Sequence, residues 1–148
     1  METAYNFQDT ELPNNTELPM KRLLIIEDDL FLQKSYKWGS VGKIDLIQAT
    51  TFDEAKKIIQ DEILDKEIPT INAISFDFNL DLGHCSSSLI NSVNGKFKGI
   101  MIAASGDPQG RKTQLLLGCT HELERKAELI DFILGQTESN NQIGNELI

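Results

Sequence analysis

The chain has 148 residues, of which 40% are hydrophobic and 25% are charged, as in an ordinary globular protein. This length favours one domain with a substantial core. Its 14 basic and 23 acidic residues give a formal net charge of −9, which argues against a nucleic-acid-binding surface. The first residues lack the features of a signal peptide, and no apolar run approaches a membrane span. We therefore expect a cytoplasmic protein that binds neither nucleic acid nor a membrane.

The beginning and the end of the chain differ from its middle. Residues 1–20 are polar with two prolines, and residues 136–148 are also polar, so we expect a flexible leader and a flexible tail. Between them, residues 21–135 alternate short apolar runs with longer amphipathic ones, which predicts a single folded domain.

Within this domain, buried strands and amphipathic helices are expected to alternate. The predicted strands span residues 23–26, 44–49, 71–76, 99–104 and, more weakly, 122–124. The predicted helices run from Asp28 or Asp29 to about Gly39, from Thr51 toward Pro69, around residues 89–93, from Asp107 to Gly118, and over 126–134 with Gly135 at the end. Five successive strand–helix units predict an α/β fold with three layers and a parallel sheet.

The strand order decides which side chains meet. A flavodoxin-like, doubly wound sheet of order 2-1-3-4-5 places the first and third strands side by side, with all carboxyl ends at one crevice. Glu27 and Asp28 follow the first predicted strand, Asp77 the third and Ser105 the fourth. We expect these four side chains to gather at that crevice.

Clustered carboxylates repel one another unless a cation lies between them. A small set of oxygen ligands suits Mg²⁺, which keeps several waters and often binds phosphate as well. The pattern therefore predicts a divalent cation beside a nucleophilic aspartate.

The two cysteines, Cys85 and Cys119, form no CxxC pair, and their neighbours His84 and His121 do not complete a four-ligand zinc motif, so we expect reduced thiols and no zinc.

Three segments resemble the strand-end motifs of response-regulator receiver (CheY-like) domains of two-component signalling. They are Leu24-Ile25-Ile26-Glu27-Asp28-Asp29, Phe76-Asp77-Phe78-Asn79-Leu80 and Ile102-Ala103-Ala104-Ser105-Gly106. Each motif is weak alone, but the three occur in the same order and on the corresponding predicted strands. The resemblance spans nearly all of residues 22–135.

The resemblance implies a role for each residue of the set. Asp77 matches the aspartate that receives a phosphoryl group from a histidine kinase or a histidine phosphotransfer protein. Asp28 matches the direct Mg²⁺ ligand and Glu27 its partner, while the backbone carbonyl of Asn79 would complete the metal shell. Ser105 matches the hydroxyl residue that moves toward the phosphoryl group. The implied function is a stand-alone receiver that catalyses at most its own phosphorylation and dephosphorylation and signals to a downstream protein effector, with a second copy of the chain as a further candidate partner.

The sequence departs from the receiver pattern in three places. A lysine normally follows the fifth strand, and here Arg125 and Lys126 compete for that role: spacing from Gly118 favours Arg125, whereas residue type favours Lys126. Only one of two strand neighbours can point into the crevice. The switch aromatic of many receivers would fall on Glu122, counted back from Arg125. Residues 81–88 replace a shorter, proline-containing loop, which predicts altered access to Asp77.

These departures leave alternatives open. A pseudo-receiver would use the same fold as a protein-interaction module that is independent of phosphorylation. A Mg²⁺-dependent phosphohydrolase of the haloacid-dehalogenase type would need a second aspartate where Asn79 stands. A flavodoxin would need phosphate-binding backbone donors and hydroxyls in the first loop, which is acidic here.

Overall fold

The computed structural model describes residues 20–136 of the chain. The predicted leader, apart from Met20, and the predicted tail, apart from Gln136, lie outside the described residues. No helix within residues 20–136 is long and apolar enough to cross a membrane.

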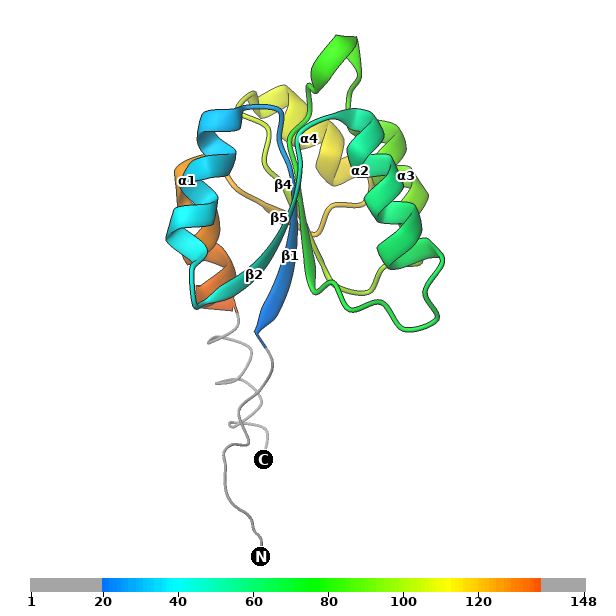
Figure 1. Ribbon diagram of the computed structural model, residues 1–148. Coiled ribbons are helices and arrows are strands. Elements are labelled where there is room, and N and C mark those ends of the chain that lie inside the picture. The colour runs from blue at the N-terminus through cyan, green and yellow to red at the C-terminus, as the bar shows by residue number, and fades with distance from the viewer. Residues whose placement is uncertain (1–19, 137–148) are drawn as a thin grey trace, which may run out of the picture.

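A parallel sheet forms the middle of the molecule (Figure 1). Its strands are β1 (Lys21–Ile26), β2 (Ile44–Ala49), β3 (Ala73–Phe76), β4 (Ile100–Ala103) and β5 (His121–Glu122). Their order is β2-β1-β3-β4-β5, and every pairing is parallel. The predicted α/β class and the predicted strand order are both confirmed.

Helices cover both faces of the sheet, as Figure 1 shows. They are α1 (Leu30–Ser40), α2 (Phe52–Ile59) with a π-helical turn (Gln60–Leu64), α3 (Ser87–Val93), α4 (Pro108–Leu117) and, after a 3₁₀ turn (Lys126–Glu128), a final helix over residues 129–136. Neighbouring residues of β1 point to opposite faces: Leu24 and Ile26 pack beneath α2 and α3, whereas Leu23 and Ile25 pack beneath α1 and the final helix. The strands are therefore buried on both sides, as their continuous apolar sequences predict.

Local capping signals fix where three helices begin. Asp29 Oδ1 accepts hydrogen bonds from the N–H groups of Phe31 and Leu32, and this selects Asp29 over Asp28 as the cap of α1. Thr51 accepts a bond from the N–H of Glu54 at the start of α2. Asp107 caps α4 ahead of Pro108, as predicted. Because Asp29 serves as the cap, Asp28 stays available to the crevice.

The predicted end of the last helix was wrong. The helix continues through residue 136, and Gly135 lies inside it without a left-handed backbone conformation. Glycine lowers helix stability by only about 1 kcal/mol relative to alanine, so the packing of Leu129, Ile130 and Ile133 against the sheet overrides it. The fifth strand also begins one residue earlier than predicted and is only two residues long.

Candidate functional site

The carboxyl ends of the central strands bring the predicted acids together. The N–H of Glu27 donates to the carbonyl of Ala49 (3.0 Å), and the N–H of Asp77 donates to the carbonyl of Ile26 (2.9 Å). These bonds extend the parallel ladder by one residue past β1 and β3, which fixes where both side chains leave the sheet. Glu27 and Asp77 are buried, with 3% and 8% of their surfaces exposed, whereas Asp28 is exposed.

We call Glu27, Asp28 and Asp77 the acidic cluster. One carboxylate oxygen from each residue lies within 4.8 Å of the others. Two of these carboxylates are buried, so their mutual repulsion is poorly screened by water. Three converging oxygen donors, one of them open to solvent, fit a hard divalent cation that keeps part of its water shell. Within residues 20–136 no other group of three or more His, Cys, Asp or Glu side chains converges in this way.

Lys126 is the basic residue that enters the acidic cluster. Its Nζ lies 2.8 Å from Glu27 Oε1 and 2.9 Å from Asp77 Oδ1. The hydroxyl of Tyr36 donates to the backbone carbonyl of Lys126 (2.8 Å), so α1 holds this turn in place. Arg125 lies outside the cluster: its side chain is 78% exposed and, among residues 20–136, pairs only with Glu128, at 3.5 Å.

Burial and charge set the protonation of this group. Burial is the main cause that raises the pKa of Glu27 to about 7, and Asp77 adds to the shift while Lys126 opposes it. Burial lowers the pKa of Lys126, but its hydrogen bonds and charge interactions with Glu27 and Asp77 outweigh burial, so the net shift is upward. Lys126 therefore stays protonated, while Glu27 gains and loses its proton near neutral pH. Burial, and the charges of the nearby acids, also raise the pKa of Tyr36.

Ser105 lies at the end of β4 with its hydroxyl turned toward α4. Its Oγ accepts a hydrogen bond from the N–H of Asp107 (3.1 Å). A Cβ at Gly110 would lie 2.5 Å from that Oγ, so the glycine provides the space that the hydroxyl occupies. The N–H of Ser105 donates to Gln114 Oε1 (3.3 Å). Ser105 is 2% exposed and is held by α4.

Asn79 pairs with Cys85 in an isolated antiparallel bridge, and the short ribbon between them projects beyond the carboxyl ends of the strands (Figure 1). The N–H of Leu80 donates to the carbonyl of His84, and the N–H of Ser86 donates to the carbonyl of Phe78. These bonds flank the pair of Asn79 and Cys85, so the ribbon leaves the carbonyl of Asn79 unused. The side chain of Asn79 is exposed.

The tip of this ribbon carries an unusual backbone. Leu82 has a φ of 55° and a side chain that is 91% exposed. Asp81 Oδ1 accepts a hydrogen bond from the N–H of Phe52 (2.7 Å), and the ring of His84 stacks on that of Phe52. The ribbon is thus anchored to the start of α2, a contact that the sequence did not reveal.

Two side chains of α4 were missed by sequence reasoning. Arg111 Nη1 donates to the carbonyl of Ser105 (2.9 Å), and its Nε lies 2.7 Å from Glu122 Oε2. Fully buried Gln114 donates to the carbonyl of Phe76 (2.8 Å) and to the hydroxyl of Ser86 (3.2 Å). Arg111 and Gln114 lie three positions apart on one face of α4, but polar residues on a helix more often face solvent. No feature of the sequence marked them as buried partners of Ser105.

The last residue of the fifth strand, Glu122, and the residue after it, Leu123, have different surroundings. Glu122 precedes Arg125 by three residues, and Leu123 precedes Lys126 by three residues. Leu123 is 5% exposed and packs in the core, whereas Glu122 pairs with Arg111.

The two cysteines are free thiols, and burial raises the pKa of Cys119 to about 12.

Comparison with known proteins gives matches of structure only. No protein-family model matches the chain, and no curated protein sequence does either. A CheY-like receiver domain from Methanospirillum hungatei superposes with a TM-score of 0.62 at 18% identity, covering 84% of this chain and 98% of that one. A response regulator from Burkholderia pseudomallei, solved with a phosphorylated aspartic acid, a calcium ion and citrate, superposes with a TM-score of 0.61 at 20% identity, covering 86% and 74%.

A third structural match is the response regulator TrrA from Thermotoga maritima in complex with Mg²⁺-BeF. It superposes with a TM-score of 0.56 at 14% identity, covering 72% of this chain and 87% of that one. Identities this low establish shared architecture and leave the chemistry to the residues themselves. The chain has the fold of response-regulator receiver domains.

Proposed function

We propose that this chain is a receiver that accepts a phosphoryl group on Asp77 with the help of Mg²⁺ and signals through protein contacts. The observation that carries the proposal is the position of Lys126, whose ammonium bridges Glu27 and Asp77 at the buried end of β3. A protonated amine held against a buried aspartate is suited to stabilise charge on a phosphoryl group attached there.

The geometry favours one oxygen of Asp77 as the nucleophile. Oδ1 accepts the N–H of Phe78 (2.8 Å) and contacts Lys126. Within residues 20–136 Oδ2 receives no such bond, so it is the oxygen left to attack phosphorus. The attack forms an O–P bond and breaks the N–P bond of a phosphohistidine, and the imidazole leaves with the electron pair of that bond. The upstream partner is therefore a histidine kinase or a histidine phosphotransfer protein.

The acidic cluster and the carbonyl of Asn79 are the groups that would hold the cation. Their fit rests on the convergence of three carboxylate oxygens and on a backbone carbonyl that the neighbouring ribbon leaves unused. When bound, a divalent cation supplies neutralisation of the charge on the phosphoryl oxygens. Glu27 contributes full negative charge only when ionised, so binding of a cation favours loss of its proton.

Ser105 supplies the proposed link from Asp77 to the protein surface. Its hydroxyl is held by the N–H of Asp107, and a phosphoryl group on Asp77 offers a stronger, charged acceptor. Movement of Ser105 would disturb the bonds that Arg111 and Gln114 make to its backbone. These bonds reach α4 and Glu122 of β5, the surface that we propose presents the signal to a downstream effector. Exchange with a histidine kinase implies a cytoplasmic setting.

Incubation of the full chain with phosphoramidate and Mg²⁺, followed by intact mass measurement, tests the proposal. We expect one acid-stable, base-labile phosphoryl group on the wild-type protein and none on Asp77→Asn. Asp53→Asn removes an exposed aspartate of α2 and serves as the matched control, which should label like the wild type. Equal labelling of Asp77→Asn and Asp53→Asn would disprove the assignment. A folded wild-type protein that takes no label would favour the pseudo-receiver.

A further inference from the structure

The opposite end of the sheet carries a second candidate site. A groove of about 420 Å³ opens where β1, β3, β4 and β5 begin, far from the acidic cluster at their carboxyl ends. We call it the amino-end groove. Its volume lies within the range of about 300–1,000 Å³ that is usual for small-molecule sites.

The floor of the amino-end groove is apolar and its rim is cationic. Leu23, Ala73, Ile100 and Ile133 supply the apolar surface, while Lys21, Arg22 and Lys98 supply positive charge. No carboxylate side chain of the described residues lines the groove. On a chain with a formal net charge of −9, a concave surface with this balance favours an anionic ligand.

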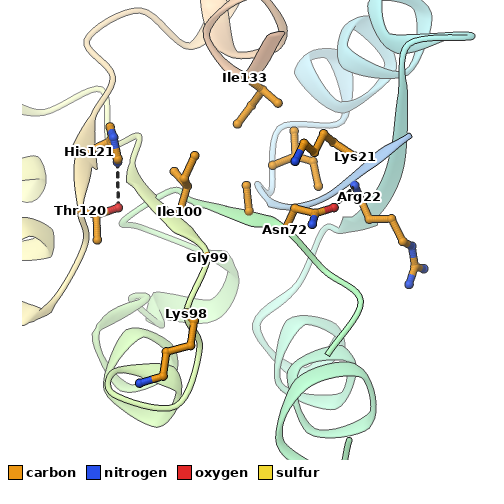
Figure 2. A pocket seen from close by; sticks show the side chains of 11 residues that line it. Lys21, Arg22, Asn72, Lys98, Gly99, Ile100, Thr120, His121 and Ile133 are labelled. Atoms are coloured by element: carbon orange, nitrogen blue, oxygen red, sulfur yellow. Dashed lines mark hydrogen bonds between the residues drawn. The ribbon is translucent and has the colours of Figure 1, made fainter. Parts of the chain in front are cut away.

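The three cations are not equally available. The guanidinium of Arg22 turns away from the groove in Figure 2, and it lies 3.0 Å from Asp45 and 3.8 Å from Glu62. The ammonium of Lys98 also points away and has only a 3.5 Å contact with the carbonyl of Gly95. Lys21 turns its ammonium toward the apolar floor (Figure 2) and has no acidic partner within residues 20–136. Lys21 is therefore the charge that a ligand in the groove would meet first.

The walls of the groove are held firmly. A Cβ at Gly99 would lie 2.2 Å from the carbonyl oxygen of Asn72, so only glycine allows β3 and β4 to approach this closely at their start. The hydroxyl of Thr120 lies 2.8 Å from Nδ1 of His121 (Figure 2). The same hydroxyl also bonds to the backbone of Met101. The contact with Nδ1 orients the imidazole at the edge of the groove. A preformed shape of this kind lowers the entropy cost of binding.

We propose that the amino-end groove binds a small monocarboxylate with a short apolar body. The apolar part lies on Ile100 and Ile133, and the carboxylate meets the ammonium of Lys21. A phosphate would need several converging donors or a free arginine, and the only arginine here is already paired with Asp45 and Glu62. The proposal rests on no part of the proposed phosphoryl chemistry, because the two sites lie at opposite ends of the sheet.

Titration of the full chain with hexanoate, followed by backbone amide chemical shifts, tests this site. We expect saturable shifts that centre on Ala73, Ile100 and His121 and that are equal in the Asp77→Asn protein. Lys21→Gln should weaken binding about three-fold, in line with one partly exposed ion pair, and Lys21→Glu should weaken it further. Lys56→Gln removes an exposed lysine of α2 and should leave binding unchanged.

Two further probes separate the recognition of charge from that of apolar surface. Hexylamine has the same apolar body with the opposite charge, and inorganic phosphate has charge without an apolar body. Weak or absent shifts with both probes would support the proposal. Shifts as strong with hexylamine or phosphate as with hexanoate, or no saturable response to hexanoate, would overturn it.

Discussion

The two ends of the sheet are built from the same strands but carry opposite charge. At the carboxyl ends, Glu27, Asp28 and Asp77 converge and Lys126 is the only cation that reaches them in the described part of the chain. At the amino ends, Lys21 and Lys98 border an apolar groove without a carboxylate from the described residues. A parallel sheet places all strand starts at one edge and all strand ends at the other. Like charges that follow the strand ends, or that precede the strand starts, therefore gather at one edge instead of being divided between the two.

The two ends also differ in how strongly their charges interact. The lysine at the carboxyl end is 21% exposed at its side chain and bridges two nearly buried acids, whereas Lys21 is exposed and unpaired among the described residues. Buried charges interact in a weakly screened environment, while exposed ones are screened by water and salt. Removal of a charged side chain should therefore change the free energy of unfolding strongly at the carboxyl end of the sheet and only slightly at the amino end. Three measurements sharpen this contrast.

The largest expected effect follows from loss of the bridging lysine. Lys126→Met leaves Glu27 and Asp77 without their cation and should lower the free energy of unfolding by about 3 kcal/mol in the absence of divalent metal. Arg125→Met and Lys21→Met remove exposed charges and should each change it by less than about 0.5 kcal/mol. Urea denaturation with a chelator present measures all three. Equal costs for Lys126→Met and Arg125→Met would contradict the assigned position of Lys126.

Divalent metal should stabilise one end of the sheet only. Mg²⁺ at about one hundred times its dissociation constant should add about 2.7 kcal/mol to the free energy of unfolding, because the proposed site exists only in the folded protein. Asp28→Ala should remove most of this gain, whereas Lys98→Ala at the amino end should keep it. Thermal unfolding over a range of Mg²⁺ concentrations measures the difference. A shift that Asp28→Ala leaves intact would rule out the proposed ligand set.

A smaller effect should appear in the pH dependence of stability. The pKa of Glu27 is about 7 in the folded protein against 4.5 for an unperturbed glutamate, so the folded protein binds this proton more tightly than the unfolded chain does. Without metal, the free energy of unfolding should therefore fall as the pH rises between these two values, by on the order of 2 kcal/mol. Glu27→Gln should flatten this slope. A wild-type slope that matches that of Glu27→Gln would show that Glu27 ionises normally.

Local sequence determined most of the architecture. Within residues 20–136, apolar runs and amphipathic spacing predicted all five strands and every long helix, because burial of an apolar face depends on a period that the sequence displays directly. The caps Thr51 and Asp107 were also predicted, and Asp29 was one of two candidates for the first helix, since a capping side chain bonds to backbone groups only two or three residues away. The βα alternation and right-handed crossovers limited the possible topologies, and the flavodoxin-like order among them predicted that Glu27, Asp28 and Asp77 meet.

Only the tertiary structure decided between Arg125 and Lys126. The fifth strand is two residues long, so the turn that follows it decides which of the next side chains points into the acidic cluster. Tyr36 of α1, 90 residues earlier in the chain, fixes that turn through its hydrogen bond to the carbonyl of Lys126. The contacts of Ser105 with Arg111 and Gln114 likewise join separate elements that no local pattern relates. The amino-end groove arises in the same way, because its walls come from the starts of four strands that are adjacent only once the sheet has formed.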